Sequence, residues 1–257
     1  MLIFLTMLLL GGILGFIGVG GAGIMIAVLT VIFGIPVHTA LGTSLGAMVF
    51  TTFSGVYSHC REGNVAWRIG SIVGIFGASG AFFGARLSAY IPSDRLAVFT
   101  GIVMLFFCAL IYVRIFHQKS RLFQLRIFQT RPSGLKFWLL AAGTGLFNGL
   151  VAGTFGVGSA PLIQLTLLVI FNISLYQTVG TTMLVIFPIG LLGGLGFLTA
   201  GYLDAGLFTQ VVLGQIIGAY IGAKFTRLAP VILLKITMLL VPAVGGLSMI
   251  IFNLFRC

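Results

Sequence analysis

Residues 178–199 read TVGTTMLVIFPIGLLGGLGFLT, a stretch without a single charged side chain. At about 1.5 Å of rise per residue, a helix needs roughly 20 mainly apolar residues to cross the hydrocarbon core of a bilayer. Five further runs reach that length, namely 40–60, 67–86, 95–114, 206–226 and 234–254. The chain of 257 residues is 59% hydrophobic and only 7% charged, too few charges to cover a water-soluble surface. The sequence therefore predicts an all-α polytopic membrane protein.

The charged residues are strongly biased toward one sign. The chain has 14 Lys and Arg against 3 Asp and Glu, for a net charge of +11. The basic residues lie in short loops between hydrophobic runs, where they orient a membrane protein with those loops on the cytoplasmic side. The sequence has no basic helix with interleaved aromatic residues. We therefore expect the lipid bilayer, and not nucleic acid, as the partner of this charge.

A glycine pattern repeats along the chain at an offset of 138 residues, the separation of Gly18 from Gly156. Hydrophobic residues coincide easily by chance, whereas glycine and proline positions at one offset do not. Without a gap, the offset superposes Gly11 on Gly149, Gly15 on Gly153, Gly20 on Gly158, Gly42 on Gly180, Thr43 on Thr181, Gly80 on Gly218, Gly84 on Gly222 and Pro92 on Pro230. We interpret the chain as two homologous repeats, 1–116 and 137–257, joined by a basic cytoplasmic linker at 117–136.

Each repeat opens with an apolar region, 2–34 and 138–172, that is interrupted by glycines. A single helix of about 35 residues would be about 50 Å long, well beyond the roughly 30 Å of the hydrocarbon core. Gly-Val-Gly-Gly at 18–21 and Thr-Phe-Gly-Val-Gly-Ser at 154–159 are natural break points, because glycine costs helix stability and tolerates unusual dihedral angles. Each region is predicted to be either a re-entrant hairpin of half-helices or a full span plus a short helix, followed by three transmembrane helices.

The positions of the basic residues favour one of these arrangements. If each region returns to its starting side, the two repeats are inverted, and 11 Lys and Arg share one side against 3 on the other. If each region crosses once, the repeats are parallel and the split is 9 against 5. The positive-inside rule therefore favours inverted repeats. The eleven residues are Arg61, Arg68, Arg114, Lys119, Arg121, Arg126, Arg131, Lys136, Lys224, Arg227 and Lys235.

The two glycine breaks are the predicted substrate site. Backbone groups at a break are tolerated in a bilayer only when buried in protein or lining a wet cavity, and in transporters paired breaks commonly meet near the midplane. A half-helix N-terminus offers unpaired N–H groups and a positive dipole end, which suit an anion. The alternative is that these glycines only allow close helix packing. The predicted substrate-binding residues at the breaks are Gly18, Gly20, Gly21, Gly156, Gly158 and Ser159, and Pro161 suits a first helical turn.

A second matched element places two hydroxyl side chains after a glycine in each repeat. Gly42-Thr43-Ser44 corresponds to Gly180-Thr181-Thr182. One hydroxyl is enough to cap a helix, so the adjacent pairs favour a role in lining the substrate site for Thr43, Ser44, Thr181 and Thr182. His38, His59 and Tyr176 are candidates for substrate contact or proton handling, the alternative for a lone histidine being an interfacial residue. Arg86 and Lys224, at equivalent positions, are predicted either to draw an anion toward the pathway or only to anchor helix ends.

Carboxylates are scarce, and Glu62, Asp94 and Asp204 all lie in predicted loops. Carriers driven by cations or protons usually keep acids inside the membrane. The three cysteines lack metal-ligand spacing. We therefore expect no catalytic residue, no metal and no cofactor, which argues against an intramembrane enzyme. An anion channel and a non-transporting membrane scaffold subunit are the alternatives to a carrier.

Four motifs in this order resemble the sulfite/sulfonate exporter family (TauE/SafE, or DUF81-like permeases). They are Gly18-Val19-Gly20-Gly21, Ala40-Leu41-Gly42-Thr43-Ser44, Glu62-Gly63-Asn64-Val65-Ala66-Trp67-Arg68 and Gly80-x-x-x-Gly84-Ala85-Arg86. The resemblance covers nearly the whole chain. It implies a permease of the prokaryotic inner membrane for sulfite, sulfonates or related organosulfur anions, often an exporter. The second copy departs from the first at Ser159 and at Leu203-Asp204, which leaves the particular substrate open.

These features together predict a secondary transporter for a small anion that works by alternating access between the two repeats. The direction of transport, coupling to protons or sodium and the oligomeric state are left open by the sequence.

Overall fold

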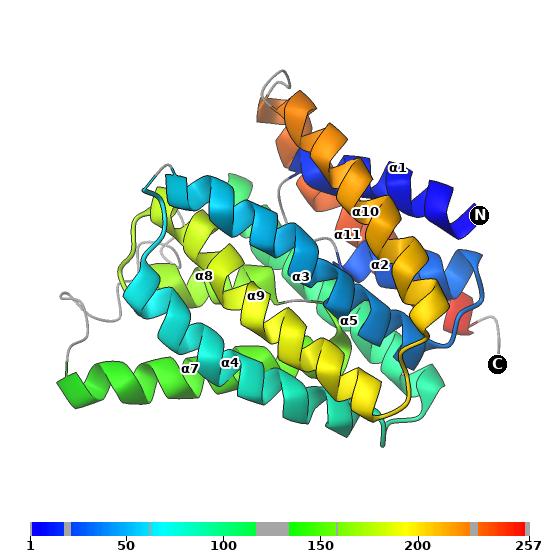
Figure 1. Cartoon of the computed structure of the whole chain (residues 1–257), viewed down its shortest axis with the longest axis horizontal. Helices are drawn as coiled ribbons and strands as arrows, with labels where there is room; N and C mark the ends of the chain where they lie inside the picture. The colour runs from blue at the N-terminus through cyan, green and yellow to red at the C-terminus, as the bar shows by residue number, and fades with distance from the viewer. Residues whose placement is uncertain are drawn as a thin grey trace.

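The computed structural model describes residues 2–17, 22–61, 63–116, 134–157, 159–226 and 231–254. Every regular element in these ranges is helical, which confirms the predicted all-α fold (Figure 1). In chain order the elements are α1 (Leu2–Ile17), α2 (Ala22–Ala27), the π-helical turn η1 (Val28–Ile32), α3 (Val37–Arg61), α4 (Trp67–Ser88), α5 (Ser93–Phe116), α7 (Gly134–Phe155), α8 (Ala160–Val169), α9 (Leu175–Thr199), α10 (Ala205–Thr226) and α11 (Val231–Leu254).

All six predicted apolar runs lie inside helices. Among the described residues, four helices are long and apolar enough to cross a membrane: α4, α5, α7 and α9. The 25-residue helix α3 is not one of these four, because it carries several Thr, Ser and His side chains. Helix α7 runs uninterrupted for 22 residues and ends at Phe155, at the predicted break of 154–159. Its glycines fit inside a helix because they pack against a neighbouring backbone.

The outer surface of the bundle is strongly apolar. Phe53 and Phe83 are each 62% exposed, and Leu139 is 66% exposed. A soluble protein rarely shows large apolar side chains over so many helices, whereas lipid is their natural environment. With the four spanning helices, this surface identifies an integral membrane protein.

Contacts at glycine positions show the directions of the central helices. A Cβ added at Gly42 on α3 would meet Phe197 on α9, and one added at Gly55 would meet Met183. Residue numbers rise on one helix as they fall on the other, so α3 and α9 are antiparallel. The same reasoning makes α5 and α11 antiparallel, because Gly101 lies against Ile250 and Met104 lies against Gly245.

The first helix of each half packs against a helix of the other half. Helix α7 lies beside α4, and α1 lies beside α10 (Figure 1). A Cβ added at Gly149 or Gly153 on α7 would collide with the carbonyl oxygens of Gly77 and Ala81 on α4. Small residues let membrane helices approach to backbone contact in this way. One added at Gly218 on α10 would collide in the same way with a carbonyl of α1.

The helix bounds recur at the offset of the glycine pattern. Adding 138 to the bounds of α3, α4 and α5 gives the bounds of α9, α10 and α11. The helices α1 and α7 likewise end at residues 17 and 155, and α2 and α8 begin at residues 22 and 160. Each of α3, α4 and α5 thus has a counterpart of the same length in the other half.

The second glycine-containing region folds back on itself. The amide of Asn148 on α7 donates to the hydroxyl of Thr166 on α8 at 3.3 Å. The rings of Phe137, at the start of α7, and Phe171, just after α8, lie 5.8 Å apart. The chain therefore leaves this region on the side where it entered, after a long helix and a short return helix. The first predicted break, 18–21, lies outside the described residues.

Replacing Gly149 by alanine should destabilise the protein strongly. The added methyl group collides with the carbonyl of Gly77, and overpacking of this kind costs about 1–3 kcal/mol. Gly143 lies on the same helix but has open space around it, so Gly143→Ala is the matched control. Thermal unfolding in detergent, followed by circular dichroism, should show a lower Tm for Gly149→Ala only. Equal Tm values for the two variants would contradict the close packing of α4 and α7.

Candidate functional site

The interruption between α7 and α8 is held by two residues with positive φ. Gly156 has φ +66°, and Ser159 has φ +47°. Only glycine adopts this left-handed region freely, so a serine there is strained. Helix α8 then begins at Ala160 with Pro161 in its first turn, as predicted. The break is thus a specific turn and not a frayed helix end.

The break is buried against other helices. A Cβ added at Gly156 would collide with Leu41 on α3 and approach Ile26 on α2. The Thr154 hydroxyl donates to the carbonyl of Gly84 on α4 at 3.3 Å. Because α2, α3 and α4 surround it, the turn is shielded from lipid, the condition for irregular backbone inside a membrane.

Ser159 presents a buried hydroxyl at the start of α8. The residue has no exposed surface, it makes no side-chain capping bond, and its Oγ has no hydrogen-bond partner. The first N–H groups of a helix also lack intrahelical acceptors. A buried hydroxyl without a partner therefore lies at a helix N-terminus, a position that suits an anion.

The four other predicted hydroxyls differ in how they are used. Ser44 donates to the Leu41 carbonyl at 2.9 Å, and Thr182 donates to the Thr178 carbonyl at 2.7 Å. Thr181 donates to the Gln177 carbonyl at 2.6 Å and accepts from the backbone N–H of Ala66 at 2.9 Å. Only the Thr43 hydroxyl is buried without a partner. Its proton is therefore available for another acceptor.

The structure separates the two predicted hydroxyl pairs. Since α3 and α9 are antiparallel, Thr43 lies near the α9 end that contains Phe197, whereas Thr181 lies near the α3 end that contains Gly55. Twelve helical residues separate Thr43 from Gly55, about 18 Å along the axis. The hydroxyl pairs therefore stand toward opposite ends of the bundle and do not form one cluster.

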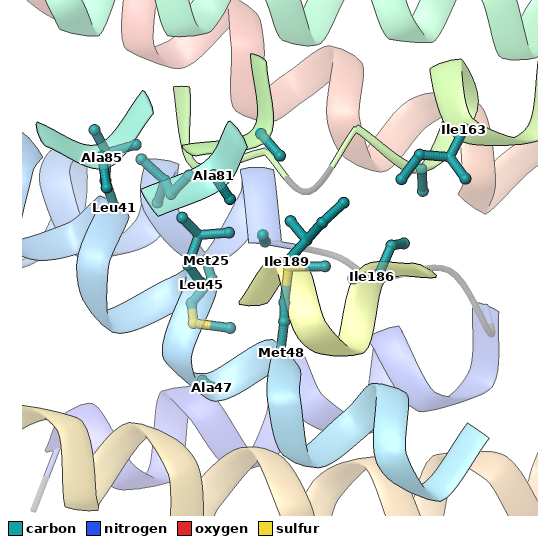
Figure 2. Close-up of a cluster of buried hydrophobic side chains, with 14 of the residues drawn as sticks. Met25, Leu41, Leu45, Ala47, Met48, Ala81, Ala85, Ile163, Ile186 and Ile189 are labelled. Atoms are coloured by element: carbon teal, nitrogen blue, oxygen red, sulfur yellow. The ribbon is translucent and has the colours of Figure 1, made fainter. Parts of the chain in front are cut away.

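An apolar cluster lies between the two hydroxyl pairs. Figure 2 shows Leu45 and Met48 of α3 together with Ile186 and Ile189 of α9. Met25, Leu41, Ala47, Ala81, Ala85 and Ile163 complete the labelled part of this cluster. Buried apolar side chains thus fill the middle of the bundle between the two polar ends.

His38 joins elements from both halves of the chain at one end of the bundle. Its Nε2 lies 2.9 Å from the Ser88 carbonyl, and its Nδ1 lies 3.3 Å from the Ser93 hydroxyl. Its ring stacks on Tyr202 with the centroids 4.7 Å apart. The buried His38 side chain therefore links α3 to the α4–α5 and α9–α10 connections. It lies at the same end of the bundle as Thr43.

The remaining predicted residues take peripheral or undescribed places. His59 packs against Gly180 at the end of the bundle that holds Thr181. The exposed guanidinium of Arg86 lies 4.7 Å from the Phe82 ring centroid on its own helix. The side chains of Tyr176 and Lys224, and the residues Gly18, Gly20, Gly21 and Gly158, lie outside the part that the structure describes.

Two buried amides were not predicted from the sequence. Asn148 is 1% exposed and Gln215 is 2% exposed, and the side-chain oxygen of each lacks a partner. An amide in the middle of an apolar helix is itself a signal, because polar groups are costly in a membrane and usually functional. Among the described residues, no group of three or more His, Cys, Asp or Glu side chains comes together to hold a metal.

Comparison with known proteins identifies the family. Residues 3–249 match the family described as "Sulfite exporter TauE/SafE". The chain belongs to the TauE/SafE family. This agrees with the motifs quoted above, and it makes the protein a membrane transporter.

Relatives of this TauE/SafE protein carry transporter names. The chain is 49% identical over 250 residues to "Probable membrane transporter protein YdhB" of Bacillus subtilis (strain 168), covering 97% of this chain and 100% of that protein. It is 25% identical over 215 residues to a "Probable membrane transporter protein" of Xylella fastidiosa (strain 9a5c), covering 83% and 80%. No solved structure matches this TauE/SafE chain.

Replacing Asn148 by leucine should loosen α8 in this TauE/SafE protein. The substitution keeps the branched shape of the side chain but removes the hydrogen bonds to Thr166 and to the Thr144 carbonyl. Hydrogen exchange of the α8 amides should accelerate, because one buried bond contributes about 0.5–1.5 kcal/mol. Asn253→Leu is the control, since Asn253 bonds only to its own helix. Unchanged exchange in Asn148→Leu would show that the amide does not hold the two helices together.

Proposed function

We propose that this protein is a secondary transporter for small anions of the sulfite and sulfonate class, and that the turn between α7 and α8 holds the anion. The single observation that carries the proposal is the Ser159 hydroxyl, fully buried and without a partner at the N-terminus of α8. A donor in this position has lost its water and gained no protein acceptor, which an anionic oxygen supplies.

The charges around the site support an anion. The two described carboxylates, Asp94 and Asp204, are exposed, and the Asp204 carboxylate accepts from the Leu207 N–H at 2.7 Å. An anion at the break therefore meets N–H and hydroxyl donors without a buried negative charge beside it. The choice of sulfur anions comes from the family description, "Sulfite exporter TauE/SafE".

The proposal includes two inverted repeats that move against each other. The shared offset of helix bounds, the antiparallel pairs α3–α9 and α5–α11, and the return of the chain after α8 support it. In inverted-repeat transporters, substrate sites form where broken helices of the two repeats meet, and rocking of one repeat exposes the site to alternate sides.

The apolar cluster favours a carrier over an open channel. The described side chains Leu45, Met48, Ile186 and Ile189 fill the space between the two polar ends, so among the described residues of α3 and α9 the polar lining is interrupted. Saturable counterflow of labelled anion would be the kinetic sign of a carrier, whereas a channel would show no counterflow.

The basic residues support an orientation in the inner membrane of a prokaryote. Arg68 lies 5.5 Å from the ring centroid of Phe137, so the starts of α4 and α7 are on the same side. Arg61 and Lys136 are at that side as well, at the end of α3 and the start of α7. By the positive-inside rule, we propose that this side faces the cytoplasm.

The test is sulfite flux into proteoliposomes for wild type and Ser159→Gly. Glycine accepts φ +47° and stands at the equivalent position, Gly21, so the substitution removes the hydroxyl without adding strain. A hydrogen bond to a charged group contributes about 1.5–3 kcal/mol, so the KM for sulfite should rise at least tenfold.

Ser44→Ala is the matched control, because this buried hydroxyl bonds to the carbonyl of its own helix. Its KM should stay near the wild-type value. The proposed site fails if Ser159→Gly transports sulfite with unchanged KM. A wild-type protein that carries neither sulfite nor an organosulfonate would reject the proposed substrate class.

A further inference from the structure

One loop of the structure is fastened to the neighbouring helix by a hydrogen bond. The backbone N–H of Ala66, directly before α4, donates to the Thr181 hydroxyl on α9 at 2.9 Å. We call this contact the α4 latch. It closes the α3–α4 loop over the end of α9 where Gly180 contacts the carbonyl of Asn64.

The equivalent contact in the other half is missing. At the offset of 138, Ala66 corresponds to Asp204, directly before α10, and Thr181 corresponds to Thr43 on α3. The Thr43 hydroxyl is fully buried and has no partner, so it accepts no bond from Asp204. The hydrogen bond from loop to helix is therefore formed at one end of the bundle, and the equivalent bond is not formed at the other end.

The difference lies in the loops and not in the helix pair. A Cβ added at Gly42 would lie 2.7 Å from the Cβ of Phe197, and one added at Gly180 would lie 2.8 Å from the Cβ of His59, so both ends of the α3–α9 pair pack alike. At the loops, a Cβ at Gly180 would collide with the Asn64 carbonyl, whereas one at Gly42 would lie 3.5 Å from the Tyr202 carbonyl. The α9–α10 loop thus lies farther from α3 than the α3–α4 loop lies from α9.

The helices that follow these two loops, α4 and α10, also differ in how closely they pack on the α3–α9 pair. Helix α4 packs closely along α9 through Gly70, Gly74 and Gly77, whereas α10 packs much less closely along α3. At the position equivalent to Gly70, α10 carries Phe208, whose ring lies against Gly46 of α3. The α4 side is therefore tightly joined, whereas the Phe208 ring stands between α10 and α3 and the α10 side is joined more loosely.

We infer that the α9–α10 loop and the start of α10 form a gate, which closes when the backbone N–H of Asp204 donates to Thr43. This inference rests on the proposed transport function, because a carrier needs a gate that opens and closes on one side of its site. The closed gate reproduces the α4 latch. It also explains why a buried threonine hydroxyl lacks a partner in the described state.

The test traps gate closure with a short bismaleimide crosslinker in proteoliposomes without substrate. The three native cysteines are replaced by serine, and new cysteines are placed at the exposed residues Pro36 and Ala205, which flank the gate. The rate of intramolecular crosslinking, divided by the single-site labelling rate, reports how often the gate closes. A reference pair at Trp67 and Ser174 reports the α4 latch, which is already closed.

Thr43→Val should slow crosslinking of the gate pair between about twofold and tenfold, the effect of losing one neutral hydrogen bond. Thr43→Ser should restore it. Ser44→Ala, which removes a neighbouring hydroxyl bonded only to its own helix, should leave the rate unchanged. The reference pair should react at one rate in all of these proteins.

The donor is tested separately at Asp204. Asp204→Pro removes the backbone N–H and should slow gate closure as Thr43→Val does. Asp204→Ala loses the carboxylate that caps α10 but keeps the N–H, so it should close normally. Equal crosslinking rates in wild type, Thr43→Val and Asp204→Pro would overturn the gate. Because no substrate is present, that result is distinct from a failure of sulfite transport, which would reject the proposed function alone.

Discussion

The absence of water in the hydrocarbon core governs this structure. Every backbone N–H and C=O inside a bilayer needs a partner from the protein, so each uninterrupted segment is helical and each interruption must be buried. The turn at Gly156 and Ser159 meets that condition, because α2, α3 and α4 enclose it. Burial also concentrates its unpaired donors in a place where an anion is their natural partner. The same constraint that makes the break costly thus makes it chemically useful.

Glycine sets how closely the helices approach. On α4, Gly80 and Gly84 face the α7 backbone while Gly70 and Gly74 face α9, so one helix is joined to two neighbours without bulky side chains. Helix α10 keeps glycine on the side facing α1 but places Phe208 toward α3. These two helices of equal length therefore pack differently, because α4 has glycine toward both of its neighbours, whereas α10 has Phe208 toward α3.

The sequence predicted the helices well because hydropathy and glycine spacing are local signals. All six apolar runs and the second break agree with the structure, and the TauE/SafE family is confirmed. The break at 154–159 was predicted, but the close packing of the α7 glycines on α4 was not, since a glycine's packing partner cannot be read from its own sequence. The separation of Thr43 from Thr181 also lay beyond the sequence, because it depends on the antiparallel pairing of α3 and α9. Hydroxyls that look alike in sequence differ in whether they donate a hydrogen bond to a carbonyl of their own helix.

The exchange of first helices between the halves has a consequence for biogenesis. Helix α1 is made well before α10, although the Gly218 of α10 contacts the α1 backbone. Helix α7, in contrast, finds α4 already inserted. During synthesis α1 must therefore wait in the lipid, or beside the insertion machinery, with its partner face uncovered. The α1 face is covered only once the second half has been made, so each half supplies packing that the other half lacks.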